Sequence, residues 1–201
     1  MLRLVRREIM NVIKKSSAGY QSFDLDAMML DMRRIFINGE ITTASMEETI
    51  KQLLFLEHED AHEPVTIVID SPGGDICAGM KLVDQIRGMP DTPITVIASG
   101  TCASMGALIL ACGRAGSRFI LPHSKVLIHE PYVASAIGGN AASIQRTVES
   151  IAQMRQMTIE LFSEACGKTH EEIEKAISYD HLFSAQEAVD FGLCDGIIDR
   201  I

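Results

Sequence analysis

Residues 92–113 read TPITVIASGTCASMGALILACG, and this stretch decides the fold class. It holds 22 residues without a charge, and about 20 apolar residues suffice to cross a bilayer. Its character changes midway, however: residues 94–97 are β-branched, 99–101 are typical of a turn, and 107–111 favour a helix. The stretch therefore predicts a buried strand, a turn and a buried helix that starts at Ser104, and no membrane span.

The same alternation of apolar strands and helices extends along the rest of the chain. Strands are predicted at 34–38, 65–69 and 94–98, with a strand pair at 118–121 and 125–129; helices are predicted at 45–57, 76–87, from 104, and at 141–166. Capping boxes at Ser45/Glu48, Thr169/Glu172 and Ser184/Glu187 add starts for the first helix and for two short final helices. Strands without polar alternation, separated by helices, indicate an α/β fold with a parallel sheet covered on both faces.

Length and charge set further limits. A chain of 201 residues fits one domain of ordinary size. Five basic residues and one acidic residue give residues 1–20 a net charge of +4, so the remaining 181 residues carry −13, because the whole chain carries −9. The acidic balance argues against a nucleic-acid binder. We expect a basic segment at 1–20 and a single domain at 21–201 that includes the long helix 141–166.

The five cysteines, Cys77, Cys102, Cys112, Cys166 and Cys194, are odd in number and scattered, and none forms a C-x-x-C pair. This pattern is typical of reduced thiols in the cytoplasm and not of a disulfide framework. No apolar run near the start is long enough for a signal peptide.

A zinc motif is matched at His58-Glu59-Asp60-Ala61-His62, which has the form H-E-x-x-H. Pro64 would end any helix just where a zinc-protease helix continues, and no third ligand is obvious. The segment is therefore interpreted as a solvated acidic loop, with no metal and no cofactor expected.

Two loops follow predicted strands and could carry chemistry. Ser104 lies between a strand and a helix, among small residues, where helix N–H groups suit an oxyanion; it could equally be an ordinary N-cap. Residues 71–74, Ser-Pro-Gly-Gly, could turn the backbone sharply and aim an N–H at a bound group, or form a tight turn without function. Carboxyl ends of parallel strands are where α/β sheets place their sites.

A histidine ends another predicted strand. His129 could be a satisfied core residue or a general base aimed at the same sheet edge. His123 is its competitor, but Pro122-His123-Ser124 is typical of a turn.

Four motifs in one order give a family resemblance. They are Ser-Pro-Gly-Gly at 71–74, Ala-Ser-Met-Gly-Ala at 103–107, Ile-His-x-Pro at 128–131, and the pattern from Asp180 to Asp195 that contains Ser-Ala-x-Glu-Ala. Together they make the chain, from about Ser22 to Ile198, similar to the Clp protease proteolytic subunit.

The resemblance implies a crotonase-like α/β fold with a protruding helical handle and a serine endopeptidase that forms an acyl-enzyme. Ser104 matches the nucleophile, His129 the general base and Asp180 the residue that orients it; the backbone N–H groups of Gly74 and Met105 match the oxyanion hole. It also implies heptameric rings, stacked as a tetradecamer, which degrade unfolded polypeptides delivered by a AAA+ Clp ATPase.

Some positions depart from the family pattern. Glu130 replaces a glutamine, and Ser178 and Tyr179 replace a charged pair that senses contact between rings. Thr66 and Val68 stand where tyrosines help to line the family's ATPase docking pocket, and segment 132–139 and the basic segment 1–20, which would line the axial pore, match poorly. A variant paralogue that needs a second kind of subunit fits these differences.

Two alternatives stay open at this point. One is a catalytically silent or conditionally active subunit of a mixed ring. The other is a crotonase-type enzyme acting on acyl-CoA, against which stands the presence of Ser104, His129 and Asp180 together.

Overall fold

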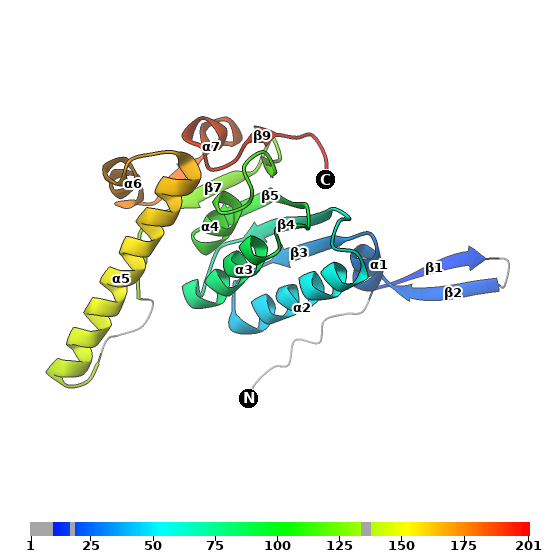
Figure 1. Ribbon diagram of the computed structural model, residues 1–201, viewed down its shortest axis with the longest axis horizontal. Coiled ribbons are helices and arrows are strands. Elements are labelled where there is room, and N and C mark those ends of the chain that lie inside the picture. Colours follow the sequence, from blue (N-terminus) through cyan, green and yellow to red (C-terminus); the bar gives the residue numbers. More distant parts are fainter. Residues whose placement is uncertain (1–9, 17–18, 134–137) are drawn as a thin grey trace.

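The computed structural model describes residues 10–16, 19–133 and 138–201 (Figure 1). The strands are β1 Asn11–Ser16, β2 Gly19–Asp24, β3 Arg34–Asn38, β4 Val65–Ser71, β5 Ile94–Ala103, β6 Arg118–Ile120, β7 Lys125–Ile128, β8 His181–Phe183 and β9 Gly196–Ile197. The helices are α1 Leu25–Asp31, α2 Thr43–Glu59, α3 Ile76–Gly88, α4 Met105–Ala111, α5 Ala141–Cys166, α6 His170–Ile177 and α7 Ala185–Phe191.

The central sheet is mostly parallel, which confirms the α/β prediction. Its strands follow the order β3-β4-β5-β6-β9, all parallel, while β7 also lies parallel to β5 and carries β8 antiparallel. The prediction of a strand pair at 118–121 and 125–129 was wrong in its pairing. β6 pairs with residues 96–98 of β5 and β7 pairs with residues 101–103, so the two strands lie one after the other along β5.

The predicted turn at 99–101 is part of strand β5. The register of β4 against β5 shifts after Ile69, and the pairing of the two strands resumes with Ser71 opposite Cys102. Asp70 accepts a hydrogen bond from the Thr101 N–H at 2.9 Å, and Ser124 accepts one from the Gly100 N–H at 2.8 Å. These side chains satisfy the backbone of the irregular segment, so β5 continues up to Ser104.

The sheet is covered unevenly, so the expectation of two covered faces was wrong for strand β3. Ile35 and Ile37 are buried, whereas Phe36, which lies between them, and Asn38, which follows Ile37, are exposed. Alternation of this kind is typical of a strand with only one face packed. Helices α2 and α3 lie together over one face of the strands (Figure 1).

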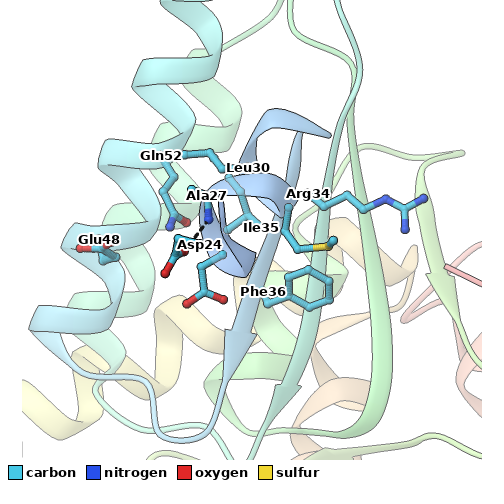
Figure 2. A pocket seen from close by; sticks show the side chains of 10 residues that line it. Asp24, Ala27, Leu30, Arg34, Ile35, Phe36, Glu48 and Gln52 are labelled. Atoms are coloured by element: carbon cyan, nitrogen blue, oxygen red, sulfur yellow. Dashed lines mark hydrogen bonds between the residues drawn. The ribbon is translucent and has the colours of Figure 1, made fainter. Parts of the chain in front are cut away.

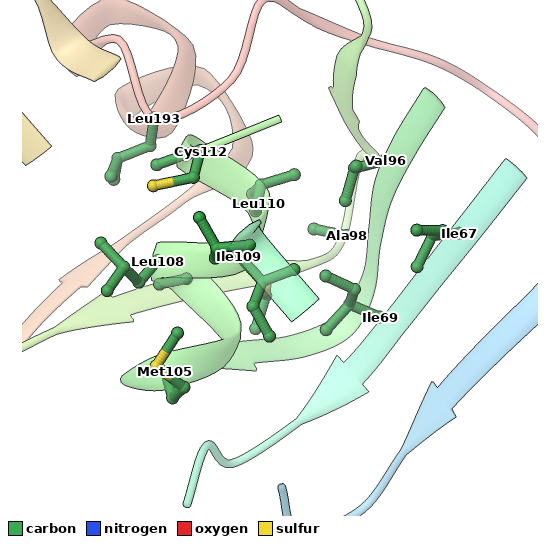
Figure 3. Close-up of a cluster of buried hydrophobic side chains, with 14 of the residues drawn as sticks. Ile67, Ile69, Val96, Ala98, Met105, Leu108, Ile109, Leu110, Cys112 and Leu193 are labelled. Atoms are coloured by element: carbon green, nitrogen blue, oxygen red, sulfur yellow. The ribbon is translucent and has the colours of Figure 1, made fainter. Parts of the chain in front are cut away.

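Helix α4 is buried on every side, which explains the long uncharged stretch around it. All of its residues, Met105 to Ala111, are buried. Figure 3 shows Leu108, Ile109 and Leu110 on α4, with Ile69 and Ala98 of the neighbouring strands in the same cluster. A helix that is apolar all round belongs to a protein core or a membrane. No helix in the described part of the chain has the length and apolar character needed to cross a membrane.

Side-chain caps mark the starts of the helices, and one of the three predicted capping boxes was wrong. The boxes at Thr169/Glu172 and Ser184/Glu187 are confirmed. The predicted Ser45/Glu48 box was wrong: Thr42 is the N-cap, and Ser45 is its N3 partner, so α2 starts two residues earlier than predicted. Helix α2 ends at Glu59, before His62, so the two histidines of the H-E-x-x-H match do not share one helix.

Two elements project from opposite ends of the body in Figure 1, the β1–β2 hairpin and the long helix α5. The predicted range of α5 is confirmed, and Gly167 ends it in the left-handed conformation at φ 63°. The hairpin spans the boundary expected between residues 20 and 21. The expectations for residues 1–9 and 134–137 lie outside the described residues.

A partly buried ion pair ties the C-terminal part to the core. The Arg118 guanidinium contacts the Asp195 carboxylate at 2.5 Å and donates to the carbonyls of Ala111 and Ala165. The two side chains are 7% and 21% exposed. Burial alone would raise the pKa of Asp195, but the hydrogen bonds and the charge of Arg118 outweigh it and hold that pKa below its ordinary value.

Replacing Arg118 by methionine is expected to destabilise the protein by about 1–3 kcal/mol at pH 7, because the partly buried Asp195 carboxylate would lose its charged hydrogen-bond partner. A carboxyl whose folded pKa is lowered contributes stability above the unfolded pKa of about 4, and this contribution is lost as the pH falls. The difference between the urea midpoints of the two proteins should therefore shrink as the pH falls below about 4, towards the lowered folded pKa of Asp195. The exposed Arg87–Glu164 pair is the control, and Arg87→Met should cost less than about 1 kcal/mol. Equal midpoints for Arg118→Met and wild type at pH 7 would contradict the argument.

Candidate active site

The carboxyl ends of three neighbouring strands form the site. Ser71 at the end of β4 pairs with Cys102 near the end of β5, and Cys102 pairs with Val126 of β7. The chain leaves these strands at residues 72–74, at Ser104 and at His129. Because the three strands are parallel neighbours, the loops that the sequence singled out separately lie at one edge of the sheet.

Ser104 sits on a strained turn between β5 and α4. Its backbone has φ 54° and ψ −118°, a region that side-chain-bearing residues rarely adopt and that costs about 1–3 kcal/mol. Its N–H donates to the carbonyl of Leu127 at 2.8 Å, and its carbonyl accepts from the N–H of Leu108 at 3.1 Å. Its side chain makes no capping hydrogen bond. The hydroxyl is thus free of the N-cap role and faces the sheet edge.

His129 bridges Ser104 and Asp180. The distance from its Nε2 to the Ser104 Oγ is 2.8 Å, and the distance from its Nδ1 to the Asp180 Oδ1 is 3.3 Å. The imidazole is 18% exposed and the carboxylate 77% exposed. A hydroxyl, an imidazole and a carboxylate in this order give a nucleophile, a base within hydrogen-bond reach and a group that orients the base.

Strand register places Asp180 beside His129. Strand β8 runs antiparallel to β7, and the last paired residues are Ile128 and His181. His129 and Asp180 are the next residues beyond that pair. This contact joins segments about 50 residues apart and left no local signal in the sequence.

Among the described residues, two backbone N–H groups in the turns beside Ser104, those of Gly74 and Met105, have no acceptor. As the first residue of α4, Met105 has an N–H without an acceptor inside the helix. Within the described residues, no acceptor is found for the N–H of Gly74 either. A Cβ on Gly73 would lie 2.6 Å from the Ser104 Cβ and 3.1 Å from the Met105 nitrogen, so only glycine allows this approach at its φ of 95°. Unpaired N–H groups of this kind can stabilise an oxyanion.

Two hollows flank the imidazole. A narrow apolar pocket lies on the Ser104 side, between Ile76, Leu108 and Phe162. A wider hollow of about 350 Å³ lies on the Asp180 side, lined by the rings of Tyr132 and Tyr179. Tyr132 packs its ring edge-on to the imidazole at 5.4 Å between centroids, a contact that sequence reasoning did not predict.

Other candidate residues lie outside this arrangement. His123 is exposed in the predicted turn. Cys102 is fully buried beneath the site, and burial raises the pKa of its thiol, so it stays protonated and offers no competing nucleophile. In the ranges that the structure describes, no group of three histidine, cysteine or acidic side chains is arranged to hold a metal.

A separate hollow of about 280 Å³ lies between α1, β3 and α2. Figure 2 shows Asp24, Phe36 and Glu48 around it, with Asp24 accepting a hydrogen bond from the Ala27 N–H at 2.9 Å. It shares no lining residue with the hollows beside His129. It is therefore not part of the candidate site.

Comparison with known proteins places this geometry in context. The model of the family described as Clp protease matches residues 16–201. The chain is 40% identical over 174 residues to the ATP-dependent Clp protease proteolytic subunit 1 of Chlamydia muridarum, covering 87% of this chain and 90% of that protein. The protein of the same name from Protochlamydia amoebophila is 38% identical over 175 residues, covering 87% and 84%.

Proposed function

The chain belongs to the Clp protease family, and from this premise we propose that Ser104, His129 and Asp180 are the catalytic residues of its serine peptidase activity. The observation that supports this proposal most directly is the 2.8 Å contact between the His129 Nε2 and the Ser104 Oγ, together with the contact between the His129 Nδ1 and the Asp180 carboxylate. Membership of the family leaves no support for the acyl-CoA alternative.

The geometry supports an acyl-enzyme mechanism. His129 takes the Ser104 proton as the oxygen attacks the scissile carbonyl, and the tetrahedral intermediate forms. The imidazolium then gives its proton to the leaving amine, and the acyl group stays on Ser104. A water molecule, deprotonated by His129, hydrolyses the ester and restores the hydroxyl. Asp180 keeps the imidazole oriented and stabilises its charged form throughout.

The N–H groups of Gly74 and Met105 are the proposed oxyanion hole. Both lack acceptors among the described residues, and Met105 opens a helix whose dipole favours a negative charge at that end. Donors of this kind act on charge that develops only in the transition state, and each is typically worth about 100-fold or more in rate.

The proposed substrates are unfolded polypeptides delivered by a AAA+ Clp ATPase in the cytoplasm. The relatives are named as ATP-dependent proteolytic subunits, which supports an ATPase partner. We place the chain in heptameric rings, either stacked as a tetradecamer or mixed with a paralogue. The basic segment 1–20 would lie at the pore of such a ring.

A silent subunit is the second candidate, favoured by the exposure of Asp180 and by Glu130, Ser178 and Tyr179 around it. A fluorophosphonate probe separates the two, because only a serine activated by its base reacts quickly. We expect the purified chain to be labelled on Ser104, as located by peptide mass spectrometry, and Ser104→Ala and heat-unfolded protein to stay unlabelled. A folded chain that takes up no probe would overturn the proposed activity and support the silent subunit.

A further inference from the structure

Arg155, near the middle of helix α5, joins two other segments of the protein. Its Nε donates to the Glu130 Oε2 at 3.1 Å and its Nη1 to the Glu174 Oε1 at 2.9 Å. The hydrogen bond to Glu174 and then that to Glu130 raise the pKa of Arg155, so the guanidinium stays charged. A planar guanidinium can hold two carboxylates in fixed directions, which a lysine ammonium cannot do.

The two carboxylates belong to the segments that carry the proposed base and its orienting acid. Glu130 directly follows His129, and its N–H donates to the carbonyl of Ile177 at 2.9 Å. Glu174 lies on α6, which ends at Ile177, three residues before Asp180. Arg155 therefore links the backbone just after His129 to the helix just before Asp180.

The position of this link matters because the strand ladder stops short of the site. The β7–β8 pairing ends at Ile128 and His181, so it fixes His129 and Asp180 from one side only. On the other side, the segments of His129 and Asp180 are held together by the hydrogen bond from the Glu130 N–H to the Ile177 carbonyl and by the Arg155 bridge. Within the described residues, the contact with His129 is the only interaction found for the Asp180 carboxylate, and its 3.3 Å is long for a hydrogen bond.

We propose that Arg155 is a positioning residue, which sets the distance between His129 and Asp180 by bridging Glu130 and Glu174. The inference rests on the proposed function, because it assigns Arg155 a role only if His129 and Asp180 act together. Arg155 touches neither Ser104 nor the imidazole, and it moves no proton.

A merely structural ion pair would behave differently. Exposed ion pairs contribute little to stability, and Arg155 is 36% exposed, with both partners about half exposed. Small displacements of catalytic groups, in contrast, can cost about 100-fold in rate. The positioning role thus predicts a large loss of turnover with little loss of stability.

The test compares Arg155→Gln and Arg155→Lys with wild type and Ser104→Ala in hydrolysis of a short fluorogenic peptide, by the full chain in its assembled form. Both Arg155 variants should lose about tenfold or more in kcat, with KM within about twofold and a melting temperature within about 3 °C of wild type. The lysine variant shows whether the planar guanidinium or only the positive charge is needed, because lysine keeps the charge and lacks the planar group that bonds both carboxylates. Arg87→Gln is the matched control, since Arg87 also pairs with a glutamate of α5, at 3.2 Å, away from the site.

Hydrogen exchange gives a readout that does not depend on turnover. Both Arg155 variants should exchange the Glu130 amide faster than wild type, whereas amides of α3 should be unchanged. Wild-type kcat in Arg155→Gln, or full rescue by Arg155→Lys, would overturn the positioning role. If wild type and Ser104→Ala were equally active, the proposed function would fail instead, which keeps the two failures distinct.

Discussion

Replacing Ser104 by alanine is expected to lower the peptidase kcat by about 10⁴- to 10⁶-fold. The variant lacks the oxygen that His129 deprotonates, so no acyl-enzyme can form, and only binding and the oxyanion donors remain to accelerate attack by water. Among the described residues, the Ser104 side chain makes no hydrogen bond other than that with His129, so alanine should fold normally. Steady-state hydrolysis of a fluorogenic peptide measures the loss, and circular dichroism checks the fold.

A matched control for this variant is Ser99→Ala. Ser99 lies on strand β5, five residues before Ser104, and is half-buried like Ser104. It should keep wild-type kcat and KM. Residual activity of Ser104→Ala above about one per cent of wild type would remove Ser104 from the reaction and would call for another nucleophile.

Local sequence predicted the helices and strands because their apolar patterns are dictated by burial. The run at 65–69 favours a buried strand, and the uncharged stretch 92–113 favours a buried strand followed by a buried helix; most of β4 and β5 and all of α4 lie in the core. The errors arose where a neighbour decides the outcome. Residues 99–101 have the composition of a turn, but the pairing of Thr101 with Lys125 of β7 and the side-chain acceptors Asp70 and Ser124 hold them in a strand.

The errors in the predicted cover of the sheet and in the N-cap of α2 have the same cause, because a neighbouring segment decides the outcome. The exposure of Phe36 depends on what packs against the outer face of β3, which a single strand cannot specify. Thr42 and Ser45 compete as N-caps for one helix, and both are good caps, so the choice follows from how the chain leaves residue 41, where Ile41 forms a bridge to Gly74. Local propensity, which slightly favours serine over threonine as an N-cap, does not decide between them.

The residues of the site also differ in whether local sequence or a tertiary contact determines them. Ser104 and His129 can be predicted as site residues from local sequence, because each follows a buried strand. The carboxyl ends of neighbouring parallel strands lie at the same edge of the sheet. Asp180 enters only through the family resemblance, since its contact with His129 follows from the register of β8 on β7. Arg155 gives no signal in the sequence, because an arginine on an exposed helix looks like any other solvated residue until α5 and α6 pack together.

Replacing Asp180 by asparagine is expected to lower kcat by about 10²- to 10⁴-fold, a smaller loss than for Ser104→Ala. An amide can donate to the His129 Nδ1 as well as accept from it, so it no longer selects the tautomer that leaves Nε2 ready to take the serine proton. The carboxylate is 77% exposed, so water can restore part of the lost hydrogen bonding, and the loss should stay below that of a fully buried triad acid.

Asp180→Asn should also react slowly with a fluorophosphonate while keeping its fold, because the same imidazole activates Ser104 towards the probe and the peptide. Asp199→Asn, an exposed acid beyond β9, is the control and should match wild type in both assays. A full rate in Asp180→Asn would show that His129 is oriented without the carboxylate. Its 3.3 Å contact would then be a consequence of the β7–β8 register and not a part of catalysis.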